Sequence, residues 1–108
     1  MSLAIFDSSV LVTMAQTDTF YVLGRIDPAL RKTVTDVVDA EMTAAPEKYV
    51  AATERYMAAR GGGLLAREEI VPGSPAYDEY MRLRSTRKNP LGNRGEDSCI
   101  ALALTRPG

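Results

Sequence analysis

The sequence predicts an α/β domain built on a short parallel sheet, because strand-like segments alternate with helical ones along the chain. Its 108 residues suffice for one domain, and 45% hydrophobic with 25% charged residues is an ordinary globular balance. The longest apolar run, Cys99 to Leu104, is too short to cross a bilayer. We therefore expect a single domain over residues 1–108, in a soluble cytoplasmic protein without a membrane partner.

The first half of the chain predicts two strands, each followed by helical segments. Residues 3–6 form an apolar run typical of a strand covered on both faces, and a helix is expected over about 9–16. A second helical stretch follows and ends at the break 27–28. The β-branched segment 32–35 predicts the next strand, and Asp36 is expected to cap the helix after it.

The second half predicts one further strand and three helices. A helix is expected to begin near Pro46 and to end at the glycines 61–63. The segment 64–71 is a strand candidate, although charged residues interrupt it. A helix is expected from Ser74 and Pro75 to about residue 88. The final helix, 95–104, is apolar nearly all round, so we expect it to be buried.

Two absences limit the chemistry. The chain has no histidine, which excludes a serine or cysteine nucleophile activated by an imidazole. Its one cysteine, Cys99, excludes an internal disulfide and a zinc site built from cysteine and histidine. Any catalysis must therefore depend on carboxylates, lysines, hydroxyl groups or a hard metal ion.

Three acidic residues are expected at the same edge of the sheet. Asp7 ends the first strand, Glu41 lies in the helix after the second strand, and Asp97 lies in the first turn of the last helix. In an open parallel sheet these positions meet at the carboxyl ends of the strands. Converging carboxylates with no histidine or cysteine partner favour Mg²⁺ or Mn²⁺, which could replace the missing histidine in phosphate chemistry. The alternative is that each acid is only a helix cap or a solvated charge.

Three segments carry a resemblance to a known family. They are LAIFDSSVL at 3–11, VTDVVDAEM at 34–42 and GEDSCIALA at 95–103. In order and spacing they resemble the acidic motifs of PIN-domain ribonucleases. The resemblance implies a three-layer domain with helices on both sides of the sheet, and a metal-dependent ribonuclease, often the toxin of a toxin–antitoxin pair.

The resemblance also implies site residues. Asp7, Glu41 and Asp97 would be the catalytic acids and metal ligands, and Ser9 would support the first acid through a hydrogen bond. The third motif leaves two registers open, so Glu96 is the alternative to Asp97; neighbouring residues on a helix point about 100° apart. Of the other acids, Asp36 is expected to be a cap and Asp39 to be solvated.

A basic stretch leads into the third motif. It contains five cations and no acid: Arg82, Arg84, Arg87, Lys88 and Arg94. Beside a metal site, such residues would contact RNA phosphates, and Arg94, Arg87 and Lys88 are the candidates. The alternative is a solvated helix face.

One departure from the family bears on activity. PIN domains continue into a further strand and another acid, whereas this sequence ends at 105–108, so we expect a PIN-like domain that is incomplete at its C-terminus. The predicted function is an RNA-cleaving enzyme dependent on Mg²⁺ or Mn²⁺, with an antitoxin, a second copy or a completing chain as protein partner. The alternatives are a non-catalytic PIN-like module that binds RNA or protein, and an interaction domain of unrelated α/β type.

Overall fold

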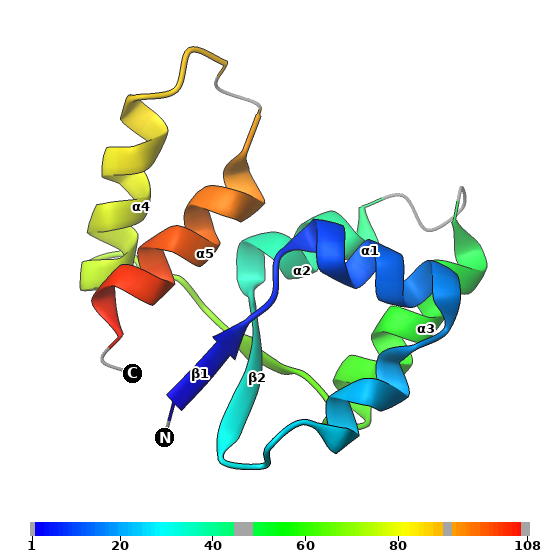
Figure 1. Ribbon diagram of the computed structural model, residues 1–108. Coiled ribbons are helices and arrows are strands. Elements are labelled where there is room, and N and C mark those ends of the chain that lie inside the picture. The colour runs from blue at the N-terminus through cyan, green and yellow to red at the C-terminus, as the bar shows by residue number, and fades with distance from the viewer. Residues whose placement is uncertain (1, 45–48, 90–91, 107–108) are drawn as a thin grey trace.

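A three-stranded parallel sheet lies at the centre of the computed structural model, which describes residues 2–44, 49–89 and 92–106 (Figure 1). The strands are β1 (Ser2–Ile5), β2 (Leu30–Thr35) and β3 (Ala66–Glu68), in the order β1-β2-β3. Helices flank this sheet. The predicted α/β class with a short parallel sheet is therefore confirmed.

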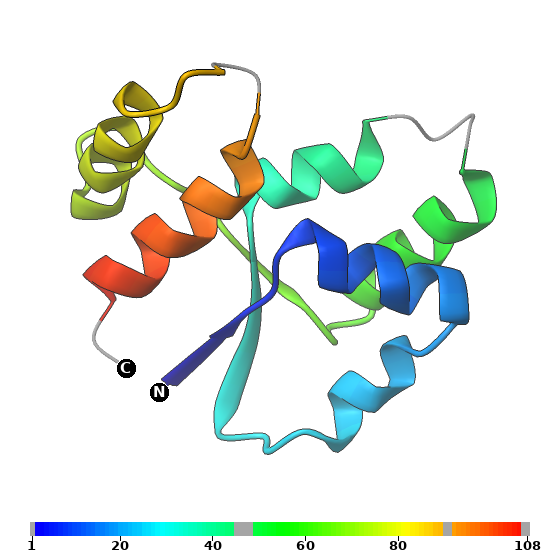
Figure 2. The same cartoon turned by 45° about the horizontal axis from the view of Figure 1, so that its top comes forward.

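Five α-helices and one short 3₁₀ helix, η1, are described. In Figures 1 and 2, α1 and α3 lie on one side of the strands, and α4 and α5 lie on the other. Within the described residues, no helix is both long and apolar enough to cross a membrane. The bounds are α1 (Ser8–Thr17), η1 (Phe20–Arg25), α2 (Asp36–Thr43), α3 (Val50–Gly61), α4 (Pro75–Ser85) and α5 (Arg94–Thr105).

The register of the sheet brings the ends of the strands together at one edge. Ile5 pairs with Thr33, and Thr35 pairs with Glu68, in parallel ladders. Both α1 and α2 begin at this edge, directly after β1 and β2. Residues at the starts of these helices therefore lie near one another, as expected for the carboxyl ends of parallel strands.

The core lies between the sheet and the helices α1, α2 and α3. Its largest fully buried side chains include Tyr56, Leu11 and Leu23, and Val34 of β2 and Val38 of α2 are fully buried beside them. Burying each of the aliphatic side chains contributes about 1.5 to 3 kcal/mol to folding. Hydrophobic packing thus holds α1 and α2 in fixed positions at the edge where they begin.

Several element boundaries differ from the prediction. Thr35, not Asp36, caps α2, because the Thr35 hydroxyl accepts a hydrogen bond from the Val38 backbone N at 3.1 Å. Asp36 instead accepts a hydrogen bond from the Ile70 backbone N at 3.0 Å. β3 is only three residues long, since pairing with β2 ends where β2 itself ends at Thr35.

The helix boundaries differ too. α4 ends at Ser85 rather than near residue 88, because Thr86 closes it with hydrogen bonds back to the last turn. α3 begins at Val50, and the expected start at Pro46 lies outside the described residues. The prediction that the final helix is buried all round is wrong. Only one face of α5 packs against the protein, and Ile100 and Leu104 on the other face are 36% and 65% exposed.

Candidate functional site

Asp7 lies at the carboxyl end of the sheet and caps α1. Its Oδ1 accepts a hydrogen bond from the Val10 backbone N at 3.1 Å and another from the Ser9 hydroxyl at 2.9 Å. From the described residues, Oδ2 receives no hydrogen bond. The cap therefore fixes the carboxylate and keeps one oxygen for a further partner. Ser9 contacts the first acid, as the resemblance implies.

Glu41 projects from α2 toward the first turn of α5. A Cβ atom on Gly95 would collide with Glu41 Oε1 and would lie 3.2 Å from Cγ2 of Val38. Alanine at position 95 would therefore force the Glu41 carboxylate to move and would press on the Val38 side chain. Although much of Glu41 is exposed, partial burial raises the pKa of its carboxyl group, which means that the negative charge is poorly solvated.

The Cys99 thiol of α5 lies beside the end of β1. Its Sγ lies 3.8 Å from the carbonyl oxygen of Phe6, which joins α5 to the end of β1. Burial and then the negative charges of Asp7, Glu41 and Glu96 raise the pKa of this thiol to about 11. Asp7 directly follows Phe6 and caps α1, and Glu41 of α2 lies against the first turn of α5, which carries Glu96. The three acids therefore belong to segments that meet at the carboxyl end of the sheet.

The donor chemistry of these three residues fits a hard cation. Carboxylate oxygens are the ligands that Mg²⁺ and Mn²⁺ prefer, and a cation would offset the mutual repulsion of the three charges. As the side chains stand, no three carboxylates or thiols within residues 2–44, 49–89 and 92–106 lie close enough together to hold an ion. Side-chain rotation of the exposed Glu41 and Glu96 would be needed to close such a site.

Asp97 occupies a different place from the other predicted acids. It is fully buried, and its carboxylate is shared by two guanidinium groups. Arg84 Nη1 lies 3.0 Å from Oδ2, and Arg87 Nε lies 3.2 and 3.1 Å from Oδ1 and Oδ2. Hydrogen bonds from Arg87 and then Arg84 lower the pKa of Asp97. Because both of its oxygens are paired, the geometry favours Glu96 over Asp97 as the third acid of the site.

Some cations of the basic stretch form ion pairs with acids of the chain, and others have exposed side chains. Arg82 forms an exposed ion pair with Glu79, and Arg87 is held by Asp97 although 31% of its side chain is exposed. Lys88 and Arg94 are exposed beside the start of α5. Of the three residues predicted to bind RNA, Arg87 forms an ion pair with Asp97, whereas Lys88 and Arg94 do not.

Two charge clusters were missed from the sequence. The first is the group formed by Asp97 with its arginines, for which the spacing of Arg84 and Arg87 was an available signal, since residues three apart share a helix face. The second is centred on Asp39, and the expectation that Asp39 is solvated is wrong. Its carboxylate accepts a hydrogen bond from the Tyr56 hydroxyl at 2.6 Å and pairs with two arginines, Arg60 and Arg67.

Comparisons of the chain with protein-family models, with curated proteins and with solved structures find no match. The resemblance to PIN domains therefore stays a prediction that depends on the three motifs.

Proposed function

We propose that this chain is a PIN-like, three-layer ribonuclease domain that acts in the cytoplasm with Mg²⁺ or Mn²⁺. The observation that supports it best is that Glu41 lies against Gly95, the residue before Glu96, while Cys99 of the same helix contacts Phe6, the residue before Asp7, at the carboxyl end of a parallel sheet. Open α/β sheets bind their ligands at this edge. Three acids at such an edge, in a chain without histidine, are suited to hold a cation that binds phosphate.

Each residue has a role in this proposal. Asp7 is held by Ser9 and by the start of α1, so it offers one oxygen without reorganisation. Glu41 is partly desolvated, which makes binding to a cation more favourable for it than contact with water alone. A bound Mg²⁺ or Mn²⁺ would supply Lewis acidity toward a phosphodiester. Lys88 and Arg94 would hold neighbouring phosphates of the RNA.

Asp97 acts as a positioning residue in this scheme. It directly follows Glu96 in the first turn of α5, and its two arginines come from the end of α4 and from the loop after it. Arg84 Nη1 also donates to the carbonyl oxygen of Gly92 at 2.5 Å, which fixes the chain just before α5 begins. The ion pairs therefore hold the turn that carries Glu96.

Cleavage of a single-stranded RNA in the presence of Mn²⁺ tests the proposed activity. We expect the wild-type chain to cleave, the Asp7→Asn variant to lose cleavage, and EDTA to abolish cleavage. The matched control is Asp18→Asn, because Asp18 is an exposed acid in the left-handed conformation that asparagine also tolerates. Equal cleavage by wild type and Asp7→Asn would contradict the proposal.

A second candidate is a non-catalytic module that binds RNA or protein. One observation favours it: the described residues contain no three donors already close enough to hold an ion. Binding of RNA to the wild-type chain without cleavage, in the presence of either metal ion, would favour this candidate.

Protein partners form part of the same proposal. Within the described residues, no second strand pairs with β1 on the side away from β2. The exposed Ile100 and Leu104 add an uncovered apolar face on α5. An open edge and an apolar face favour association. We include as partners a second copy, a completing chain or an antitoxin.

A further inference from the structure

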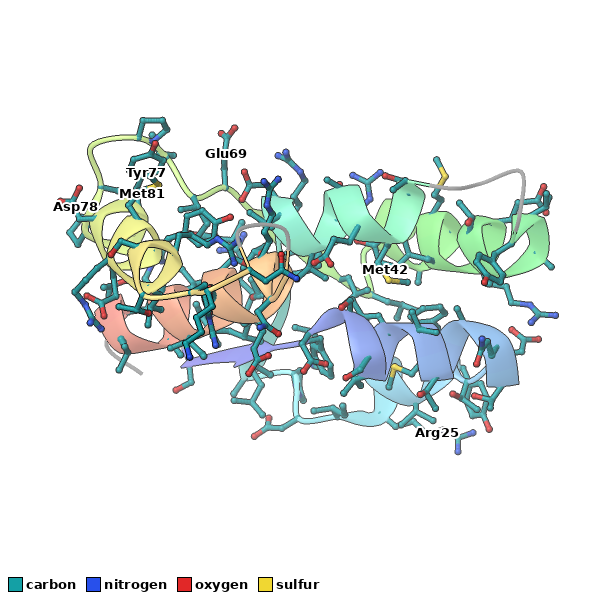
Figure 3. The ribbon with its side chains drawn as sticks, turned by 90° about the horizontal axis from the view of Figure 1, so that it is seen from above. Arg25, Met42, Glu69, Tyr77, Asp78 and Met81 are labelled. Atoms are coloured by element: carbon teal, nitrogen blue, oxygen red, sulfur yellow. The ribbon has the colours of Figure 1, made fainter. Side chains whose placement is uncertain are left out.

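An open cavity of about 350 Å³ lies between α1, α2 and α3, apart from the charge clusters described above. Its walls are mainly apolar and are formed by Val12, Ala15, Met42 and Ala52. Figure 3 shows the Met42 side chain between α2 and α1. Cavities of a few hundred Å³ with apolar walls and a few polar groups are the usual form of a small-molecule site.

Besides Glu41 and Tyr49, two uncharged polar side chains line this cavity. Gln16 comes from α1, and Thr53, which is only 7% exposed, comes from α3. Neither the Gln16 amide nor the Thr53 hydroxyl makes a hydrogen bond within the part of the chain that the structure describes. Together they offer donors and acceptors to an occupant.

A hydrogen bond joins two of the helices that form the cavity, and one aromatic residue lines it. Arg55 of α3 donates to the carbonyl oxygen of Ala15 at 2.9 Å, which ties α3 to α1 beside the cavity. The half-exposed Tyr49, at the start of α3, contributes its ring. An aromatic ring, apolar walls and free amide and hydroxyl groups are the features that recognise an unstacked nucleobase.

The cavity adjoins the acidic site, because Glu41 lines the cavity and its carboxylate lies against Gly95. We propose that this cavity is a nucleobase pocket, which receives one unpaired base of an RNA strand whose phosphate lies at the acids. The identification of RNA rests on the proposed function. The position of Glu41 makes the base in the pocket a neighbour of the phosphate to be cleaved.

The polar groups favour a base over an apolar side chain of a protein partner. An apolar occupant would cover the Thr53 hydroxyl and the Gln16 amide without bonding them, and such unpaired groups weaken binding. A nucleobase can bond both groups through its edge while its faces contact Tyr49 and Met42.

The test uses the four nucleoside 5′-monophosphates and ribose 5-phosphate, titrated into the full chain in EDTA and followed by NMR. Ribose 5-phosphate carries the same sugar and phosphate but no base. We expect at least one of the nucleotides to bind about tenfold more tightly than ribose 5-phosphate, since stacking of a base on an aromatic ring has an effect of this order. Because no metal is needed, failure of the metal site leaves this measurement unaffected.

Matched variants locate the binding. Ala52→Leu fills the cavity and should remove the preference for nucleotides, whereas Ala51→Leu, at an exposed neighbouring position on the same helix, should keep it. Thr53→Val and Gln16→Leu remove the polar groups at nearly constant size and should change the ranking of the four nucleotides. These two variants also keep the test valid if Ala52→Leu does not fold.

Three results would overturn the nucleobase pocket. The first is equal affinity for ribose 5-phosphate and all four nucleotides. The second is an unchanged nucleotide preference in Ala52→Leu, Thr53→Val and Gln16→Leu. The third is wild-type self-association that Ala52→Leu abolishes, without nucleotide binding, which would make the cavity a protein interface. Cleavage of RNA with any of these results would leave the proposed function standing.

Discussion

Replacing Asp97 with asparagine removes one buried charge and keeps the size of the side chain. The change leaves the guanidinium groups of Arg84 and Arg87 without the negative charge between them, and the Arg84 side chain is only 11% exposed. Removing one partner of a buried ion pair costs about 3 to 5 kcal/mol of stability. Arg87 is partly exposed and asparagine can still accept a hydrogen bond, so we expect a loss of about 2 to 3 kcal/mol. For a domain of this size that corresponds to a fall in Tm of roughly 10 to 20 °C.

Calorimetric or circular-dichroism melting at several pH values measures this effect. The lowered pKa keeps Asp97 ionised in the folded state, and its ordinary pKa of about 4 keeps it ionised in the unfolded state at neutral pH. The stability that depends on the charge is therefore complete at pH 7 and is lost as the pH falls through the folded pKa. The difference between wild type and Asp97→Asn should stay constant from pH 7 to 5 and shrink below about pH 4.

The control is Arg82→Ala, which removes an exposed ion pair from α4, the helix that carries Arg84, and should leave Tm nearly unchanged. Asp97→Asn should weaken Mn²⁺ binding less than Glu96→Gln does, because Asp97 positions the turn that carries Glu96 and does not itself bind the ion. A Tm equal to that of wild type, or a complete loss of Mn²⁺ binding in a well-folded Asp97→Asn variant, would refute the reasoning.

Three further predictions concern the close approach of α5, the basic stretch and the sheet edge. Gly95→Ala should lower Tm and weaken Mn²⁺ binding, because its Cβ atom would meet the Glu41 side chain. The control Gly61→Ala should change neither property, because a Cβ atom there meets no other atom within 4 Å. Equal Tm values for the two variants would contradict the close approach of α5 to Glu41. Arg94→Ala should weaken binding of all RNA sequences similarly and flatten the salt dependence, and an unchanged slope would make Arg94 a solvated residue. Sedimentation at micromolar concentration should show that the chain self-associates, or binds a chain that completes the sheet, through the edge of β1. A folded, stable monomer would show that this edge needs no partner.

Much of the architecture was predictable from local pattern. The apolar run at the start of the chain and the β-branched segment before Asp36 both form strands, because these patterns depend on short-range preferences. The 3₁₀ helix η1 falls in the predicted second helical stretch, but its type was not predicted. The cap of α2 was assigned to Asp36 instead of Thr35, since two adjacent residues of capping type leave the boundary open in the sequence.

The site was predictable only in part, because long-range pairing decides the role of each acid. Asp7 and the start of α2, the helix that carries Glu41, lie at the edge where the parallel strands end, which the order of the elements already indicates. Whether Glu96 or Asp97 faces that edge depends on the rotation of α5. Contacts from outside the motif fix that rotation, among them the pairing of Asp97 with Arg84 and Arg87 and the buried hydrogen bond between Ser98 and Thr35.

The exposed face of α5 has a similar explanation. Ile100 and Leu104 belong to the same apolar run as Leu102, yet only Leu102 packs against the protein. An apolar run indicates which residues prefer burial, but not which surface covers them.

Calorimetric titration with Mn²⁺ tests the central claim that Asp7, Glu41 and Glu96 form one cation site. We expect the wild-type chain to bind about one Mn²⁺. The variants Asp7→Asn, Glu41→Gln and Glu96→Gln should each stay folded and bind Mn²⁺ about tenfold or more weakly than the wild type. The bound ion should also raise the Tm of the wild type and not that of Asp7→Asn. Wild-type affinity for Mn²⁺ no greater than that of Asp7→Asn would contradict the claim.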